Sequence, residues 1–448
     1  MSYAVKVVTK IFFLEPSAFP TVQRSMADQT KISPPAPAAQ ADSAFFRQSG
    51  WLMIANIAGG IFAMGVHFLN KWISAGEYST FVTLLMVTAC LPTIPLQMVL
   101  AQQSAKAIAE NRRGELAGVI RLTFWGVTLV WLIAAVVVFF CQARIVAGWN
   151  LPSAMGLWVT LLVVLVSLWM PVFNGALQGK QDFLAMGWAA IGGGFARVAV
   201  AALLVLGFKG ESAAMLLGAF AGMAILAGVA MWRTRDLWTA KPEPFDKRRL
   251  LAQVVPLMFG FTACQFMFTA DTMFASALFS REELKPYGAA GTLSRALLWL
   301  VLPLAAVMFP KLVHANSKSE KNNLFGLVLG GTGLLTVVGA AGLWLVGPIV
   351  VKIIFKEGDV STVMRLLPWY AFAMAPLAMA NVVVNDLMAR EKFRVIPWMI
   401  ALAVAYGFVL PWAVHHWPGR LEVLLQTLGL FNLLLLLVCG VGALRKQN

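Results

Sequence analysis

Long apolar runs dominate the sequence, and they constrain its fold more than any other feature. Each run holds about 20 residues or more, which is the length that an α-helix needs to cross the hydrocarbon core of a bilayer. Only 12% of the 448 residues are charged and 60% are hydrophobic, whereas about a quarter of the residues in soluble domains are charged. A soluble helix would show one apolar stripe, but these runs are apolar all round. The sequence therefore predicts an all-α polytopic membrane protein.

We place twelve membrane-spanning helices in the sequence, divided by a basic segment into two bundles of six. The twelve runs cover residues 49–70, 79–100, 118–141, 155–177, 184–207, 212–232, 250–279, 287–313, 324–351, 363–389, 394–415 and 421–442. The polar, proline-rich start of the chain has too little apolar surface to fold alone. We therefore expect a disordered tail over 1–47, an N-terminal lobe over 48–232, a basic connector over 233–249, a C-terminal lobe over 250–443 and a short tail over 444–448.

Lysines and arginines gather in alternate loops between the runs. The loops predicted to lie inside hold Lys106, Arg112, Arg113, the six basic residues of the connector, Lys318, Lys321, Arg390, Lys392 and Arg394. The remaining loops hold single charges or balanced mixtures. The positive-inside rule then places both termini in the cytoplasm. The same distribution accounts for the net charge of +15 without nucleic acid as a partner.

Two short motifs recur in the two halves at nearly the same spacing. Leu177-Gln-Gly-Lys180-Gln-Asp-Phe183 is matched 210 residues later by Leu387-Met-Ala-Arg390-Glu-Lys-Phe393, and Glu77-Tyr78 is matched by Pro286-Tyr287 at an offset of 209. These matches indicate a duplication. Because each half has an even number of spans, the repeats are parallel, and a substrate would bind between the two bundles.

The most informative polar residues are Asp271 and Arg295, which lie inside two neighbouring apolar runs. Asp271 lies about eight residues before the end of one run and Arg295 about eight residues into the next, so both lie about 12 Å from the same membrane face. A charge at that depth is costly by a few kcal/mol unless it faces a partner or a wet cavity. Asp271 could pair with Arg295 or could bind a coupling Na⁺ or H⁺.

Five further residues within the spans are candidates for substrate contacts. Arg197 lies in the middle of the fifth span, where a guanidinium could bind phosphate oxygens in pairs or could pack in a polar helix interface. Asn174 and Asn385, with neighbouring amides, could contact sugar hydroxyls, form an inner gate or join helices. His67 and Lys71 end the first span and could line an outer mouth or form an ordinary interfacial end.

Several function classes lack their sequence signatures. The chain has no Walker motif, no plausible nucleophile and base in an aqueous loop, and no outer loop longer than about a dozen residues. These features argue against an ATPase and against a membrane glycan polymerase or ligase. The four cysteines and the His415-His416 pair show no metal-ligand spacing. We therefore predict neither an enzyme nor a metal site, and no cofactor other than a coupling ion.

The chain resembles the multidrug/oligosaccharidyl-lipid/polysaccharide (MOP) exporter superfamily, and within it the Wzx-type polysaccharide flippases. The resemblance covers about residues 45–442 and rests on the 6+6 plan, the Asp-bearing seventh span, Tyr287-Gly-Ala-Ala-Gly, Phe309-Pro310-Lys311-Leu312 and the Leu-x-Gly/Ala-Lys/Arg-x-x-Phe turns. It implies a V-shaped transporter, like the MATE and MurJ proteins, with alternating access around a cationic cavity.

The resemblance also implies a function. A flippase of this kind moves a polyprenyl-diphosphate-linked oligosaccharide across the bacterial inner membrane for O-antigen or exopolysaccharide assembly, and Arg295 and Arg197 would attract the anionic head. The expected partners are the glycan, the lipid bilayer and the polymerase or ligase machinery. Lipid II flippases usually carry two further C-terminal helices, so twelve spans favour another glycan. A cation-coupled multidrug exporter dependent on Asp271 is the alternative, and a glycan polymerase or ligase is the second.

Overall fold

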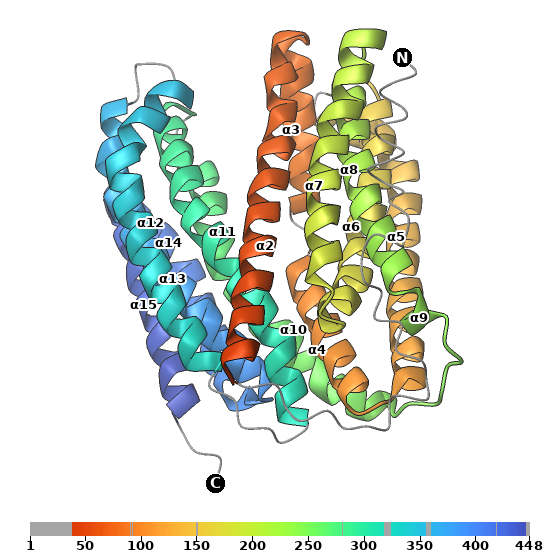
Figure 1. The fold of residues 1–448 in the computed structure, drawn as a ribbon. Coiled ribbons are helices and arrows are strands. Elements are labelled where there is room, and N and C mark those ends of the chain that lie inside the picture. The colour runs from red at the N-terminus through yellow and green to blue at the C-terminus, as the bar shows by residue number, and fades with distance from the viewer. Residues whose placement is uncertain are drawn as a thin grey trace. The chain divides into compact units, whose positions relative to one another are not determined.

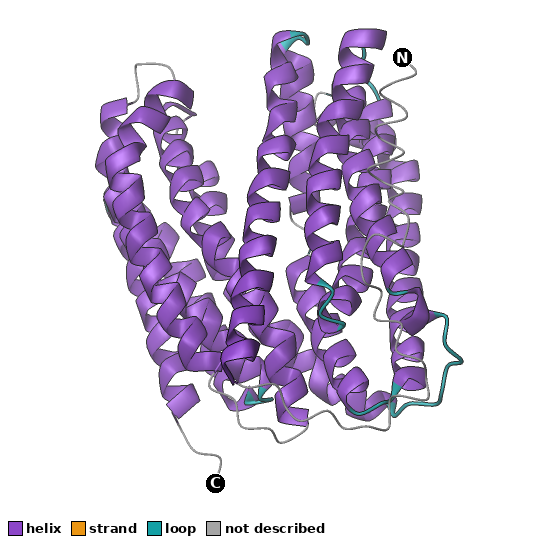
Figure 2. Cartoon of the chain, viewed as in Figure 1, coloured by secondary structure: helices purple, strands orange, loops and turns teal. Residues whose placement is uncertain are grey.

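The fold is described from a computed structural model over residues 38–89, 91, 93–148, 151–279, 281–317, 324–354, 360–417 and 419–444. Every regular element in these ranges is a helix (Figure 2). The chain divides into two units, residues 1–44 and residues 45–448. The description below concerns the second unit.

The described residues of the first half form eight α-helices and two irregular helical turns (Figure 1). They are α2 (Ala38–Gly65), η3 (Val66–Lys71), α3 (Ala75–Ala89), α4 (Thr93–Ala109), α5 (Arg113–Gly148), α6 (Met155–Gly179), α7 (Phe183–Ala202), η4 (Leu203–Gly207), α8 (Ser212–Arg233) and α9 (Arg235–Trp238). The turn η3 is a 3₁₀-helix, and η4 is a π-helical turn that continues α7.

The second half begins after the loop that follows α9. Its elements are α10 (Lys247–Leu278), α11 (Arg281–Ser317), α12 (Leu324–Ile354), α13 (Val360–Ala389), η6 (Phe393–Val395), α14 (Ile396–His416) and α15 (Leu421–Leu444). The division into two six-helix lobes stays a prediction.

Ten helices within the described ranges are long and apolar enough to cross a membrane. The predicted eighth span lies within the 37-residue helix α11, where Val301–Asn316 forms a shorter apolar stretch. The predicted second span, 79–100, is wrong as a single helix, because α3 ends at Ala89 and α4 begins at Thr93. Pro92 lies in this gap, and proline disfavours helical conformation at the residue before it.

The start of α2 corrects the predicted extent of the N-terminal tail. The sequence predicts disorder up to residue 47, whereas α2 begins at Ala38. Four alanines within 38–44 favour a helix at this point. The prediction for residues 1–37 lies outside the described part of the chain.

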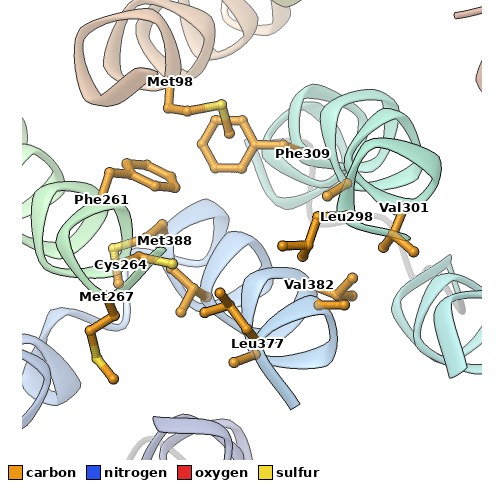
Figure 3. Packing of buried hydrophobic residues seen from close by; sticks show 14 of the residues in the cluster. Met98, Phe261, Cys264, Met267, Leu298, Val301, Phe309, Leu377, Val382 and Met388 are labelled. Carbon is orange, nitrogen blue, oxygen red and sulfur yellow. The ribbon is translucent and has the colours of Figure 1, made fainter. Parts of the chain in front are cut away.

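The two halves share one hydrophobic core at one end of their helices. Met98 of α4 and Phe309 of α11 point toward one another there, beside Phe261 of α10 and Met388 of α13 (Figure 3). A second buried cluster takes its residues from the opposite ends of the first-half helices, for example Phe81 of α3. The halves therefore pack tightly against each other at the end where α4 meets α10 and α11.

Glycines allow α7 to approach α8 at backbone distance. A Cβ added at Gly193 would lie 2.8 Å from the carbonyl oxygen of Gly222, and a Cβ at Gly222 would lie 2.6 Å from that of Gly193. Small residues at a helix interface are the usual means of such close packing in membranes. The run Gly192-Gly193-Gly194 in the sequence therefore has a packing role.

We expect Gly193→Ala to destabilise the protein by about 1–3 kcal/mol, because the added methyl group forces α7 and α8 apart. The matched control is Gly228→Ala in α8, where an added Cβ meets no atom within 4 Å and the change should stay within about 1 kcal/mol. Thermal unfolding in detergent, followed by tryptophan fluorescence, measures the difference. Equal melting temperatures for the two variants would contradict the prediction.

Candidate functional site

Asp271 of α10 and Arg295 of α11 form an ion pair within the second half. Nη2 of Arg295 lies 2.7 Å from Oδ1 and 2.6 Å from Oδ2 of Asp271. The Asp271 side chain is fully buried, whereas Arg295 keeps 16% of its side-chain surface exposed. The matched depths predicted from the sequence thus correspond to a direct contact between the two charges.

Two tyrosines complete the surroundings of the carboxylate. The hydroxyl of Tyr287 donates to Oδ2 of Asp271 at 2.8 Å, and the hydroxyl of Tyr370, from α13, donates to the same oxygen. The two hydroxyls lie 3.2 Å apart. Tyr370 also places its ring 5.4 Å from the guanidinium carbon of Arg295. Sequence reasoning missed Tyr370, although a tyrosine within an apolar run needs a partner for its hydroxyl.

Gly291 makes room for Arg295 on α11. A Cβ at position 291 would lie 2.9 Å from Nη1 of Arg295 and 3.0 Å from the hydroxyl of Tyr370. Helical side chains point toward the N-terminus of their helix, so Arg295 passes Gly291 on its way to Asp271. The motif Tyr287-Gly-Ala-Ala-Gly291 therefore supplies both a hydroxyl donor and the space that the ion pair needs.

Arg197 and His67 lie together in the first half, apart from this ion pair. Arg197 of α7 packs against Gly222 of α8, and its buried Nε has no hydrogen-bond partner among the described residues. His67 lies near Arg197, and its Nδ1 lies 2.8 Å from the hydroxyl of Tyr78. Lys71 is exposed at the end of η3. A role for these residues in substrate binding stays a prediction.

Asn174 belongs to a chain of amides that connects the two halves. Its Nδ2 donates to Oε1 of Gln97 at 3.1 Å, and Nε2 of Gln97 donates to Oε1 of Gln178 at 3.0 Å. Nε2 of Gln178 then donates to the carbonyl oxygen of Ala306 in α11 at 2.9 Å. Asn385 instead donates within its own helix, to the backbone and side-chain oxygens of Asn381.

Two further polar links join α4 to the end of α13. Nε2 of Gln102 donates to the carbonyl oxygen of Met388 at 3.0 Å, and the ammonium of Lys106 lies 2.5 Å from Oε1 of Glu391. Sequence reasoning placed both loops on the same side of the membrane but did not pair Lys106 with Glu391. Together with the bond from Gln178 to Ala306, these links join the two halves at the end where they share a hydrophobic core.

The motif that repeats in the sequence forms the same backbone turn in both halves. Gln181 and Glu391 follow the ends of α6 and α13, and both adopt left-handed conformation, with φ of 62° and 56°. The amide of the next residue bonds back five residues in each case, from Asp182 to Leu177 and from Lys392 to Leu387. This is the Schellman pattern of helix termination. The sequence repeat is therefore also a structural repeat at this turn.

The sequence model of the family described as "Lipid II flippase MurJ" matches residues 99–409 of the chain. The chain belongs to the MurJ family. It is thus a multi-pass membrane transporter of the MOP superfamily, a flippase or exporter rather than an enzyme, which confirms the predicted superfamily and excludes the polymerase or ligase alternative. The sequence analysis took twelve spans as an argument against lipid II, and membership of the MurJ family removes that argument. The family match does not support the narrower Wzx-type assignment.

Solved MATE transporters share the fold of the MurJ-family chain. A variant of the Vibrio cholerae transporter VcmN aligns with a TM-score of 0.74 and 12% identity over 90% of this chain and 96% of that one. The eukaryotic transporter AtDTX14 aligns with a TM-score of 0.76 and 10% identity, over 91% and 96%. A multidrug-resistance MATE transporter in an outward-facing conformation aligns at 0.66 and 14%, over 89% and 94%. Curated protein sequences gave no match.

We expect Asp271→Asn to lower the free energy of unfolding by about 3–5 kcal/mol, because it leaves the Arg295 charge without its counter-ion. The double variant Asp271→Asn/Arg295→Gln should recover most of that loss, since no isolated charge remains. Melting temperatures of the two single variants and the double variant in detergent form the required cycle. Additive effects of the two changes would show that the ion pair does not couple the residues energetically.

Proposed function

We propose that the chain moves a polyprenyl-diphosphate-linked glycan outward across the bacterial inner membrane by alternating access. Membership of the lipid II flippase family supports a lipid-linked substrate. The observation that carries the proposal is Arg295, a cation inside the bundle whose side chain stays partly exposed although it is paired. Such a group can add hydrogen bonds to phosphate without losing its anchor on Asp271.

The arrangement around Asp271 favours an anionic substrate over a cationic drug. Arg295 and two tyrosines already donate to the Asp271 carboxylate, whose side chain is fully buried. A drug cation would have to displace these donors, whereas a phosphate needs only the exposed part of Arg295. In this proposal Asp271 positions Arg295, and Arg197 supplies a second cation in the first half.

The basic loops support a cytoplasmic location for the end where the halves are joined. Lys106, Arg390 and Lys392 lie at this end, and the positive-inside rule assigns such loops, with both termini, to the cytoplasm. The bonds of Gln102, Lys106 and Gln178 would then form the cytoplasmic gate. In this proposal the present conformation is closed toward the cytoplasm, and the substrate enters the space between the halves only after the gate opens.

The glycan itself has two candidate classes that share the diphosphate. The family description names lipid II, and the sequence resemblance favours an oligosaccharide for O-antigen or exopolysaccharide assembly. Reconstituted vesicles loaded separately with each lipid would distinguish them, because the protein should transfer one to the opposite leaflet faster than the other.

Arg295→Ala should abolish transfer of the lipid-linked glycan, because the diphosphate loses its cation inside the bundle. The matched control is Arg365→Ala, which removes an arginine of α13 that is 65% exposed and paired with Glu422. A deletion strain complemented with each variant gives the readout. Labelled lipid-linked glycan should accumulate on the cytoplasmic leaflet with Arg295→Ala only. Normal export with Arg295→Ala, together with changed sensitivity to cationic drugs, would refute the proposal.

Gly291→Ala should reduce transfer severalfold, because its methyl group would occupy the space beside Nη1 of Arg295. The methyl group would also lie 3.0 Å from the hydroxyl of Tyr370, so the melting temperature should fall too. The fall should be smaller than for Asp271→Asn, because Arg295 keeps its counter-ion. The control is Gly330→Ala in α12, where no atom lies within 4 Å of an added Cβ. Unchanged transfer by Gly291→Ala would show that this position of Arg295 is not required.

A further inference from the structure

A polar cavity of about 570 Å³ lies between the two halves at the joined end. It is lined by Lys106, Glu110, Val313, Asn316, Ala389, Arg390, Glu391 and Lys392. Its residues come from the ends of α4, α11 and α13, so the cavity is built by both halves together. The cavity is separate from the Asp271–Arg295 pair, and neither the ion pair nor the amide chain of Asn174 uses it.

Three cations with different anchors face this cavity. The Lys106 ammonium has a single polar partner among the described residues, Glu391, and keeps 15% of its side-chain surface exposed. Arg390 uses its Nε to bond Oδ1 of Asp386 at 2.8 Å, which leaves its two terminal amines without a hydrogen-bond partner among the described residues. Lys392 donates to the carbonyl oxygen of Ala443 at 3.0 Å. Lys106 and Arg390 therefore retain donors that an anion could use.

Glu391 holds Lys106 from a strained backbone position. Its φ of 56° lies in the left-handed region, which glycine and asparagine tolerate and which is unfavourable for other residues. The corresponding turn after α4 places Asn111 in this conformation. The matching turn after α6 places Gln181 in the same conformation, with φ of 62°, so the conformation belongs to the helix end. Glu391 differs from Gln181 in that its carboxylate forms an ion pair with Lys106 of the other half.

We propose that this cavity is the first binding site for the diphosphate of a lipid-linked substrate. A phosphate oxygen replaces Glu391 as the ion-pair partner of Lys106, and the gate opens as a result. The inference rests on the proposed function and adds a recognition step before transport. Phosphate oxygens bind Lys106 from the first half and Arg390 from the second half. Glu391, whose side chain is 36% exposed, then turns into water. The halves then lose the ion pair that links Lys106 to Glu391, while the hydrogen bonds of Gln102 and Gln178 remain.

Removing the positive charge and removing the negative charge of the ion pair should have different effects on phosphate binding, and this difference distinguishes the proposal from a purely structural role of the pair. Lys106→Gln and Glu391→Gln both break the ion pair, so a latch alone would make the two variants behave alike. In our proposal they diverge: Lys106→Gln removes a phosphate ligand, whereas Glu391→Gln removes its competitor. Lys106→Arg is the matched control, because it keeps the positive charge.

Binding of geranylgeranyl diphosphate to the full chain in nanodiscs tests the proposal, with geranylgeraniol as the control for binding through the tail alone. We expect the dissociation constant to rise about tenfold or more with Lys106→Gln, the loss expected for one charge-assisted hydrogen bond. It should fall or stay unchanged with Glu391→Gln, and Lys106→Arg should resemble the wild type. Equal weakening by Lys106→Gln and Glu391→Gln, or no effect of either, would overturn the proposal.

The transfer assay distinguishes failure of this inference from failure of the proposed function. If the wild type transfers lipid-linked glycan in vesicles but Lys106→Gln does not weaken binding of the diphosphate, the cavity is not the first site and the flippase function stands. If the wild type neither binds the diphosphate nor transfers any lipid-linked glycan, both proposals fail.

Discussion

The buried carboxylate of Asp271 is the charge on which the packing of the second half depends. It accepts hydrogen bonds from Tyr287 and Arg295 of α11 and from Tyr370 of α13, so three helices meet at one group. An ionised carboxylate in an apolar bundle is costly unless such donors surround it. The requirement aligns α10, α11 and α13 along their axes, because displacement of any one would separate the carboxylate from at least one donor. The partly exposed side of Arg295 is the result of this arrangement.

The sequence was sufficient for the parts of the fold and site that follow from helix geometry. Apolar runs of spanning length predicted most helices, and equal depth on adjacent spans predicted that Asp271 and Arg295 would lie close together. The contribution of Tyr370 could not be predicted, because it lies 99 residues from Asp271 along the chain and its approach depends on how α13 packs. The break between α3 and α4 was missed for another reason: the apolar run continues through Pro92, and hydropathy alone does not register the loss of a backbone donor.

The joined end combines strong apolar packing with polar links that are individually weak. Met98 and Phe309 contribute to a core shared by both halves (Figure 3), and two amide-to-carbonyl bonds cross beside them, from Gln102 and Gln178. Each neutral hydrogen bond adds only about 1 kcal/mol net. Side-chain amides can also exchange such partners for water when a cavity opens. An interface that must separate during transport is therefore better served by these bonds than by buried ion pairs, whose separation leaves charges uncompensated.

The two halves carry a tyrosine at matching positions of the sequence repeat, but the two tyrosines bond to different kinds of partner. Tyr78 and Tyr287 occupy matching places in the sequence repeat, and each bonds to a polar residue that precedes it in the chain: His67 in the first half and Asp271 in the second. The acidic partner allows the second half to hold Arg295 in a neutral pair, while the first half leaves Arg197 without a carboxylate that bonds to it among the described residues. One arginine is thus paired and the other is not within the described part of the chain, and in our proposal the charge of Arg197 adds to the hydrogen bonds that Arg295 offers an anion.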